Sequence, residues 1–207
     1  MGMVCSLQRI TSSDVERISA APEVAVALME ESDGEFLPVE IVRPRGCLGF
    51  LLRLTPITIE QVAPRPDGED LPLPVMDPRR MEIDKVWDVM NFLLTGTAMG
   101  GEPPAAFLVT GGRSLETDDD ETDLRMFTPE EVKAIDDHLR SLTLDDLRAR
   151  IDIPRMVKER VLSKSRGNEP PGRTNEYLEQ VLAEFDPLRE FVAVAAANFE
   201  GLLVRLN

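Results

Sequence analysis

The sequence contains few of the residues from which catalytic and metal sites are usually built. It has one histidine, His138, and two cysteines, Cys5 and Cys47, among 207 residues. One histidine excludes zinc motifs with paired histidines, and two cysteines form neither a disulfide framework nor a zinc cluster. We expect His138 to be a surface residue of a helix, which leaves a catalytic triad unsupported. The sequence therefore predicts no catalytic residue, no metal and no cofactor, and it favours a protein that is not an enzyme.

Aromatic residues and long apolar segments are also scarce. Aromatic residues make up 5% of the chain, so aliphatic side chains must fill most of the core. No run of about 18 apolar residues occurs, which excludes a membrane-spanning helix. No basic segment followed by an apolar one opens the chain, which argues against a secretory signal. We expect a cytoplasmic protein.

Phosphate-binding loop motifs are missing, although glycines occur in pairs. Gly100-Gly101 and Gly111-Gly112 fit neither GxGxxG nor GxxxxGK[ST]. Gly111-Gly112 follows an apolar run and precedes Arg113, so its backbone N–H groups could bind an anion. The other interpretation is a tight turn at which the chain leaves a sheet. Both alternatives stay open, and Gly111, Gly112 and Arg113 form the candidate anion site.

Acidic residues, by contrast, are abundant. The chain has 38 acidic and 23 basic residues, a net charge of −15. Such a surface repels a phosphate backbone, so nucleic acid is disfavoured as the primary ligand and a basic protein becomes a plausible partner. The charge is also segregated: residues 114–152 carry a net −8 and residues 153–173 a net +4. An acidic face can steer and select a basic partner, but it can also simply keep a protein soluble.

The densest acidic segment is a candidate binding surface. Asp118 and Asp120 would occupy the first two ligand positions of an EF-hand loop, but Asp123 and Pro129 then stand where glycine and glutamate are required. A calcium loop is therefore excluded, and a solvated loop or a protein-interaction surface remains. The candidate partner-binding residues are Asp118, Asp119, Asp120, Glu121, Asp123, Asp136 and Asp137.

Local patterns predict strands at both ends of the chain and helices between them. Residues 3–9 and 202–206 are predicted strands, and residues 105–110 (AAFLVT) a further one. Ser13 with Glu16, Thr128 with Glu131 and Thr143 with Asp146 have the spacing of helix capping boxes. Residues 84–94 predict a buried helix, capped by Asp84 and ended by Gly96, because apolar residues surround most of it. Trp87, Leu93, Leu94, Phe107 and Val109 are predicted to be almost fully buried.

This pattern predicts the α+β class. We expect one compact domain over residues 1–207, with a mixed or antiparallel sheet flanked by helices. Prolines interrupt the apolar runs of residues 35–80, which predicts an insertion rich in proline.

Several ordered motifs resemble one known family. The opening MGMV, DKVW at 84–87, FLLTG at 92–96, FLVTGG at 107–112 and FTPEEV at 127–132 occur in one order. In these ordered motifs, the chain resembles the YfbM-like family of bacterial proteins, which is a family of unknown function. The similarity covers about residues 1–31, 81–150 and 176–207, and it implies a compact α+β fold and a bacterial origin.

The sequence leaves two functional hypotheses. The first is a non-enzymatic protein-binding module of the immunity or antitoxin type, whose acidic face neutralises a basic partner such as a toxin. The second is a small-molecule or anion-binding domain, possibly an enzyme, that uses the turn at Gly111-Gly112-Arg113.

Overall fold

The structure is a computed structural model that describes residues 4–31, 77–83, 86–116, 122–163, 167–168 and 170–207. The chain divides into two units, one made of residues 1–32 and 77–207 and the other of residues 33–76. All the elements named below belong to the first unit. Most of the predicted proline-rich insertion, and the predicted N-cap Asp84, lie outside the described residues.

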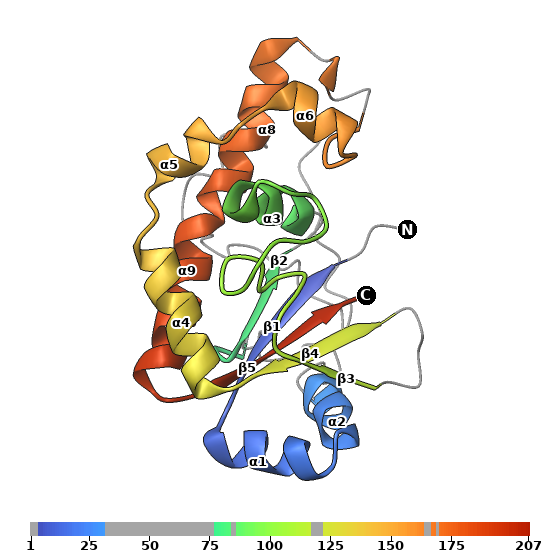
Figure 1. Ribbon diagram of the computed structural model, residues 1–207, viewed down its shortest axis with the longest axis vertical. Coiled ribbons are helices and arrows are strands. Elements are labelled where there is room, and N and C mark those ends of the chain that lie inside the picture. The colour runs from blue at the N-terminus through green and yellow to red at the C-terminus, as the bar shows by residue number, and fades with distance from the viewer. Residues whose placement is uncertain (1–3, 32–76, 84–85, 117–121, 164–166, 169) are drawn as a thin grey trace, which may run out of the picture. The chain divides into compact units, whose positions relative to one another are not determined.

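The first unit is built on a five-stranded antiparallel sheet in the order β2-β1-β5-β4-β3. Its strands are β1 (Cys5–Ile10), β2 (Arg80–Ile83), β3 (Arg113–Leu115), β4 (Asp123–Phe127) and β5 (Gly201–Leu206). β1 pairs with β5 along its whole length, from Cys5 opposite Leu206 to Ile10 opposite Gly201. The two strands predicted near the ends of the chain are therefore confirmed, and they lie next to each other in the sheet (Figure 1).

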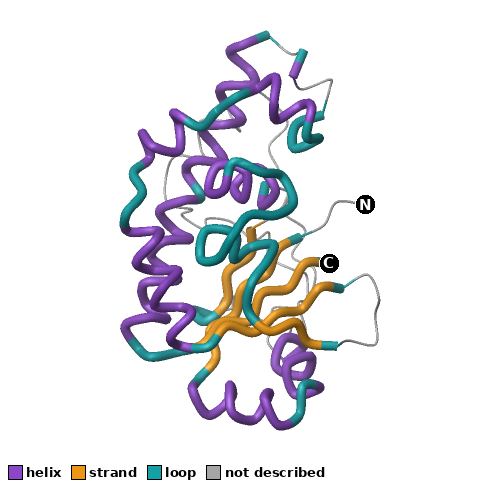
Figure 2. The backbone as a smooth tube through the Cα atoms, viewed as in Figure 1, coloured by secondary structure: helices purple, strands orange, loops and turns teal. Residues whose placement is uncertain are grey.

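Helices cover both faces of this sheet (Figures 1 and 2). Side chains that alternate along β1 and β5 pack on the larger group of helices through Leu7, Leu202 and Val204. That group is α3 (Trp87–Thr95), α4 (Pro129–Arg140), α5 (Leu144–Ala149), α6 (Ile153–Lys158), α8 (Pro171–Ala183) and α9 (Phe185–Ala197). The opposite face carries Ile10, Met126 and Leu203, which pack under α1 (Ser12–Ala20) and α2 (Glu23–Glu31). The predicted α+β class is thus confirmed.

Capping boxes fix where several helices begin. Thr128 and Glu131 cap α4, and Thr143 and Asp146 cap α5, as the sequence predicted. At α1 the prediction was wrong by two residues, because Thr11 and Asp14 form the box in place of Ser13 and Glu16. The Thr11 and Asp14 side chains satisfy amides that the first turn leaves without a partner.

The central helix α3 is buried nearly all round, as its apolar sequence predicted. Trp87, Leu93 and Leu94 are buried, and Gly96 ends the helix in a left-handed conformation with φ of 79°. The helix begins at Trp87, with Val86 as its N-cap, so the predicted start at residue 84 with Asp84 as the cap was wrong. Val109 is half-buried, so its predicted near-complete burial was wrong.

The strand predicted at residues 105–110 was also wrong. This segment forms consecutive turns, in which the Thr110 amide donates to the Ala106 carbonyl. Phe107 and Leu108 are nevertheless fully buried. The carbonyls of Phe107 and Leu108 accept hydrogen bonds from the Arg125 guanidinium, which replaces the strand ladder that the sequence suggested. A short apolar run indicates burial but does not distinguish a strand from a buried turn.

Candidate functional site

The predicted acidic residues do not gather in one place. Asp118 to Glu121 lie outside the described residues. Asp123 begins β4 and forms an ion pair with Arg125 at 3.1 Å. Asp136 and Asp137 lie in α4, which starts beyond the opposite end of β4 (Figure 1). A partner would therefore contact Asp123 and Asp137 at separate parts of the surface.

Asp136 and Asp137 themselves differ sharply in exposure. Asp136 is 3% exposed and accepts a hydrogen bond from Arg140 Nε at 2.8 Å. That hydrogen bond, together with the charge of Asp136, raises the pKa of Arg140. Asp137 lies on the surface and forms an ion pair with Lys133 one turn earlier. Asp137 can thus present its carboxylate to another molecule. The Asp136 carboxylate is buried and already bound to Arg140 of the same helix.

A charged groove runs between α4 and α9, whose contact makes them a packed pair. It consists of a hollow of about 480 Å³ and a second of about 210 Å³, which share Arg140 as a wall. Alanines of α9 form the apolar part of the lining, and charged side chains form the rest. The lining residues are Lys133, Asp136, Asp137, Arg140, Asp186, Arg189, Glu190, Ala193, Ala196 and Ala197. We call this feature the α4–α9 groove.

The charges of the α4–α9 groove are largely paired. Lys133 pairs with Asp137, Arg140 with Asp136, and Arg189 with Asp186. Glu190 has no ion pair with any residue that the structure describes. The lining thus has four acidic and three basic side chains, and Glu190 is the carboxylate that leaves it with a small excess of negative charge.

The Gly111-Gly112-Arg113 segment is a closely packed turn. Both glycines have positive φ, 86° and 64°. A Cβ on Gly112 would lie 2.7 Å from the Met126 carbonyl oxygen, and one on Gly111 would lie 2.9 Å from Pro103 Cγ. Arg113 is exposed and donates to the Ser19 carbonyl of α1 at 3.3 Å. Packing and backbone conformation thus account for both glycines without any ligand.

His138 was predicted to be a surface residue, but it is only half exposed. Its Nε2 atom is buried and has no hydrogen-bond partner among the residues that the structure describes. Burial, with a smaller contribution from the nearby positive charge of Arg150, lowers the pKa of His138. Among the described residues, no nucleophilic side chain forms a hydrogen bond with the His138 imidazole, so these parts of the chain give no support to a triad.

Buried polar side chains hold the segment between α3 and β3. Asn91 is fully buried and donates to the carbonyls of Thr97, Ala98 and Gly100. Arg125 is 4% exposed and holds the carbonyls of Phe107 and Leu108. These contacts were not predicted, because no pattern near Asn91 or Arg125 shows which distant carbonyls they bind.

Cys5 is buried beside Arg125 and is not a reactive thiol. Burial raises the pKa of the Cys5 thiol to about 12. A thiol with such a pKa is protonated at neutral pH and is a poor nucleophile or metal ligand. In the described parts of the chain, no three His, Cys, Asp or Glu side chains form a group that could hold a metal ion. No helix in those same parts is long and apolar enough to cross a membrane.

An antiparallel sheet covered by helices on both faces defines an α+β protein, and two of those helices line a charged groove. The chain belongs to the family described as "Domain of unknown function (DUF1877)", which it matches over residues 1–205. Its structure is similar to the crystal structure of YfbM from Escherichia coli, a protein of unknown function. The TM-score is 0.59, the sequence identity 17%, and 99% of each chain is covered. The predicted YfbM-like resemblance is therefore confirmed, and at this identity it concerns the fold. No curated protein matches the chain.

Proposed function

We propose that the protein is a non-enzymatic binding module of the immunity or antitoxin type, which neutralises a basic protein partner. The observation that supports this proposal most directly is the α4–α9 groove. The groove contains Asp137, one of the acidic residues that the sequence analysis selected, and it adds Glu190 from α9.

The lining of the groove suits a protein surface better than a small molecule. Sites for small molecules are mostly apolar and enclose most of the ligand. In the larger hollow, Ala193 is the one apolar residue, and the other lining residues are charged. An open groove lined mainly by charged residues and by a few alanines of α9 fits a partner that lays side chains across it.

Electrostatics support a basic partner. The whole chain carries a net charge of −15, which attracts a basic protein over distances of about one Debye length, roughly 8 Å at physiological ionic strength. Glu190 and Asp137 then supply local carboxylates within the groove. Exposed pairs of this kind mainly raise the association rate and select against wrong partners.

Charge reversal in the groove tests the proposal. In the variant with Asp137→Lys and Glu190→Lys, we expect weaker capture of the partner from the native host, and a wild-type complex that dissociates as salt rises. Both side chains are on the surface, so the unfolding midpoint should change little. Glu176→Lys is the control, because Glu176 is an exposed residue of α8 outside the groove. Identical sets of captured proteins for wild type and the double variant would overturn the proposal.

The second candidate is anion binding at Gly111-Gly112-Arg113. The exposed guanidinium of Arg113 favours it, whereas the close packing of both glycines has a structural cause. If this site binds sulfate or phosphate, millimolar anion should raise the thermal midpoint of wild type more than that of Arg113→Ala. An equal rise in both proteins would exclude the site.

A further inference from the structure

Asp136 is a charged side chain that the fold buries at a surface hollow. Its side chain is 4% exposed, and it lines the smaller hollow of the α4–α9 groove. Ala196 and Ala197 of α9 line the same hollow, and their small side chains leave it open. A carboxylate withdrawn from water needs a cation close to it. Asp136 therefore requires a cation in every stable state of the groove.

The cation that Asp136 holds in this structure is Arg140, one turn further along α4. Arg140 Nε donates to Asp136 Oδ1 at 2.8 Å. The two partners differ in burial, because the Arg140 side chain is 60% exposed. An exposed arginine keeps rotamer freedom that a buried side chain has lost, so Arg140 can move more readily than Asp136. The ion pair thus consists of a fixed anion and a movable cation.

Arg140 is the residue that the two hollows of the groove share. Glu190 of α9 lines the larger hollow and forms no ion pair with any residue that the structure describes. The other acidic residue of that hollow, Asp186, already pairs with Arg189 at 2.8 Å. Arg140 thus lies between a carboxylate that it holds and a second one that lacks a cation.

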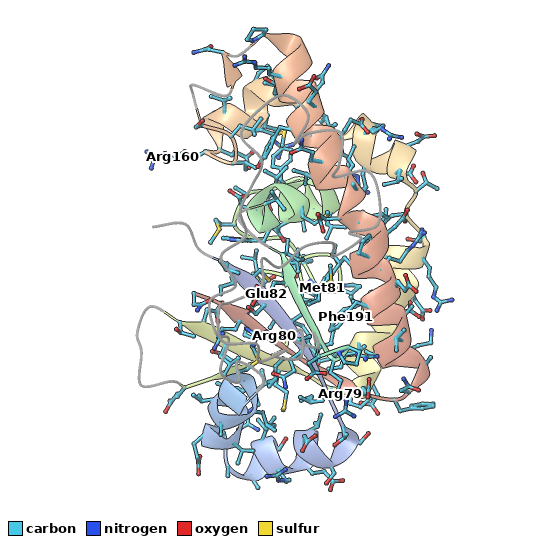
Figure 3. All side chains as sticks on the ribbon, turned by 180° about the vertical axis from the view of Figure 1, so that it is seen from behind. Arg79, Arg80, Met81, Glu82, Arg160 and Phe191 are labelled. Atoms are coloured by element: carbon cyan, nitrogen blue, oxygen red, sulfur yellow. The ribbon has the colours of Figure 1, made fainter. Side chains whose placement is uncertain are left out.

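The packing of α9 keeps Glu190 in the lining of the groove. Consecutive residues of an α-helix point about 100° apart. Phe191, which follows Glu190, packs on the core side of α9, where Arg9 of β1 lies over its ring (Figure 3). Ala193, one turn after Glu190, lines the same hollow. Glu190 therefore stays on the exposed side of α9, in the hollow that Arg140 also lines.

We infer that Asp136 and Arg140 form an exchange site for a basic side chain of the partner protein. A lysine or arginine of the partner takes the place of Arg140 on Asp136, and Arg140 turns to Glu190 in the larger hollow. The exchange keeps the buried carboxylate paired and gives Glu190 the cation that it lacks, so one ion pair becomes two. This inference rests on the proposed function and adds to it the residue that the partner's basic side chain contacts.

The first test follows the Arg140 Nε–H signal by NMR in the full-length protein, with a tetralysine peptide of blocked ends as the probe. We expect the peptide to shift this signal, because Nε leaves the Asp136 carboxylate. A tetraglutamine peptide should leave the signal in place. The signal of Arg148, whose ion pairs with Asp145 and Glu179 are exposed, should move less. An Arg140 signal that does not respond to tetralysine overturns the inference.

Removal of the resident cation gives the second test. Arg140→Gln frees Asp136 of its competitor, so tetralysine should bind this variant about fivefold or more tightly than wild type. Bound peptide should also restore part of the thermal midpoint that the variant loses. Arg148→Gln is the control, because it removes another exposed, ion-paired arginine and changes the net charge equally; its affinity should stay within about twofold of wild type. An equal gain in both variants contradicts the exchange.

Glu190→Gln removes the second partner of Arg140. Tetralysine should therefore bind Glu190→Gln about threefold or more weakly than Glu176→Gln, which makes the same charge change on α8 outside the groove. Equal affinities for these two variants would show that Arg140 does not turn to Glu190, and the exchange would fail.

The double variant Asp136→Asn, Arg140→Gln guards against misfolding. It removes both charges of the buried pair, so no carboxylate is left buried without a cation and the fold should be kept. Its affinity for tetralysine should fall below that of Arg140→Gln to the wild-type value or lower. Binding as tight as that of Arg140→Gln would exclude Asp136 as the exchange site.

The outcomes separate this inference from the proposed function. If the Asp137→Lys, Glu190→Lys variant loses the host partner but tetralysine leaves the Arg140 signal unchanged, the acidic module stands and the exchange fails. If wild type and that variant capture identical host proteins but tetralysine shifts the Arg140 signal and binds Arg140→Gln more tightly, the exchange site stands and the proposed function fails.

Discussion

Arg150 donates a hydrogen bond to the carbonyl oxygen of Leu94 at 2.6 Å, and so ties the C-cap of α5 to the last turn of α3. The same guanidinium nitrogen donates to the Leu93 carbonyl at 2.8 Å. The last four carbonyls of a helix have no partner within the helix, so a cation at this end stabilises it. Arg150, at the end of α5, thus supplies hydrogen bonds to carbonyls that the buried helix α3 leaves without a partner.

Arg150→Met should destabilise the protein by about 1–3 kcal/mol, because it leaves the Leu93 and Leu94 carbonyls without this donor. Urea unfolding measures the change. Arg148→Met is the control, since Arg148 makes exposed ion pairs with Asp145 and Glu179. Such pairs contribute about 0–1 kcal/mol. Equal losses in the two variants would show that the carbonyl contacts of Arg150 add nothing.

His138 should make stability depend on pH. Its folded-state pKa lies below the ordinary value of 6.5, so the fold favours the neutral imidazole. The associated stability is fully present above 6.5 and is lost as pH falls from there through the lowered pKa of the folded state. In thermal unfolding, wild type should lose more stability than His138→Gln over this window. NMR titration should also show a higher His138 pKa in Arg150→Met; an unchanged pKa would contradict the role of that charge.

Gly112→Ala and Gly96→Ala separate packing from backbone strain. Both glycines have positive φ, but a Cβ at Gly96 has nothing within 4 Å, whereas at Gly112 it would lie 2.7 Å from the Met126 carbonyl oxygen. We expect a loss of about 1–2 kcal/mol for Gly96→Ala from the left-handed conformation alone. Gly112→Ala should lose clearly more, as measured by chemical denaturation. A smaller loss at Gly112 would contradict the close packing described for this turn.

Trp87→Ala should cost on the order of 3–5 kcal/mol, because the indole is buried at the start of α3 and its removal leaves a cavity. The denaturation midpoint measures the change. Met99→Ala is the comparison, since that side chain is 65% exposed and its loss should cost less than about 0.5 kcal/mol. An unchanged denaturation midpoint in Trp87→Ala would contradict the assignment of α3 to the core.

Features encoded by neighbouring residues could be predicted from the sequence. The capping boxes at Thr128 and Thr143 and the burial of α3 follow from spacing along the chain. The strands β2, β3 and β4 were not predicted, because they are short and each carries charged residues. Arg80–Ile83 becomes a strand by pairing with β1, and Asp123–Phe127 by pairing with β5. Such pairing depends on partners far along the chain, which propensity does not reveal.

The candidate site was predictable in residue type but not in arrangement. Asp137 and Lys133 stand four residues apart, as do Arg140 and Asp136, so their pairing could have been read from helical spacing. Asp136 is buried and lines the smaller hollow together with Ala196 and Ala197 of α9, a helix that lies far along the sequence. The exposure and the left-handed backbone of Phe199 could not be predicted before the end of α9 was located. In the sequence alone, a phenylalanine before Glu200 and Gly201 is not unusual.

The pairing of β1 with β5 has a consequence for synthesis of the protein. β5 lies between β1 and β4, so the β1–β2 pair stays separate from the β3–β4 pair until residues 201–206 have been made. Until then, Leu7 and Met126 on the neighbouring strands lack their β5 partners, Val204 and Leu203. The nascent chain therefore spends translation with unpaired strand edges, the state in which chaperones bind and proteases cleave. The complete five-stranded sheet can therefore form only after β5 has been translated.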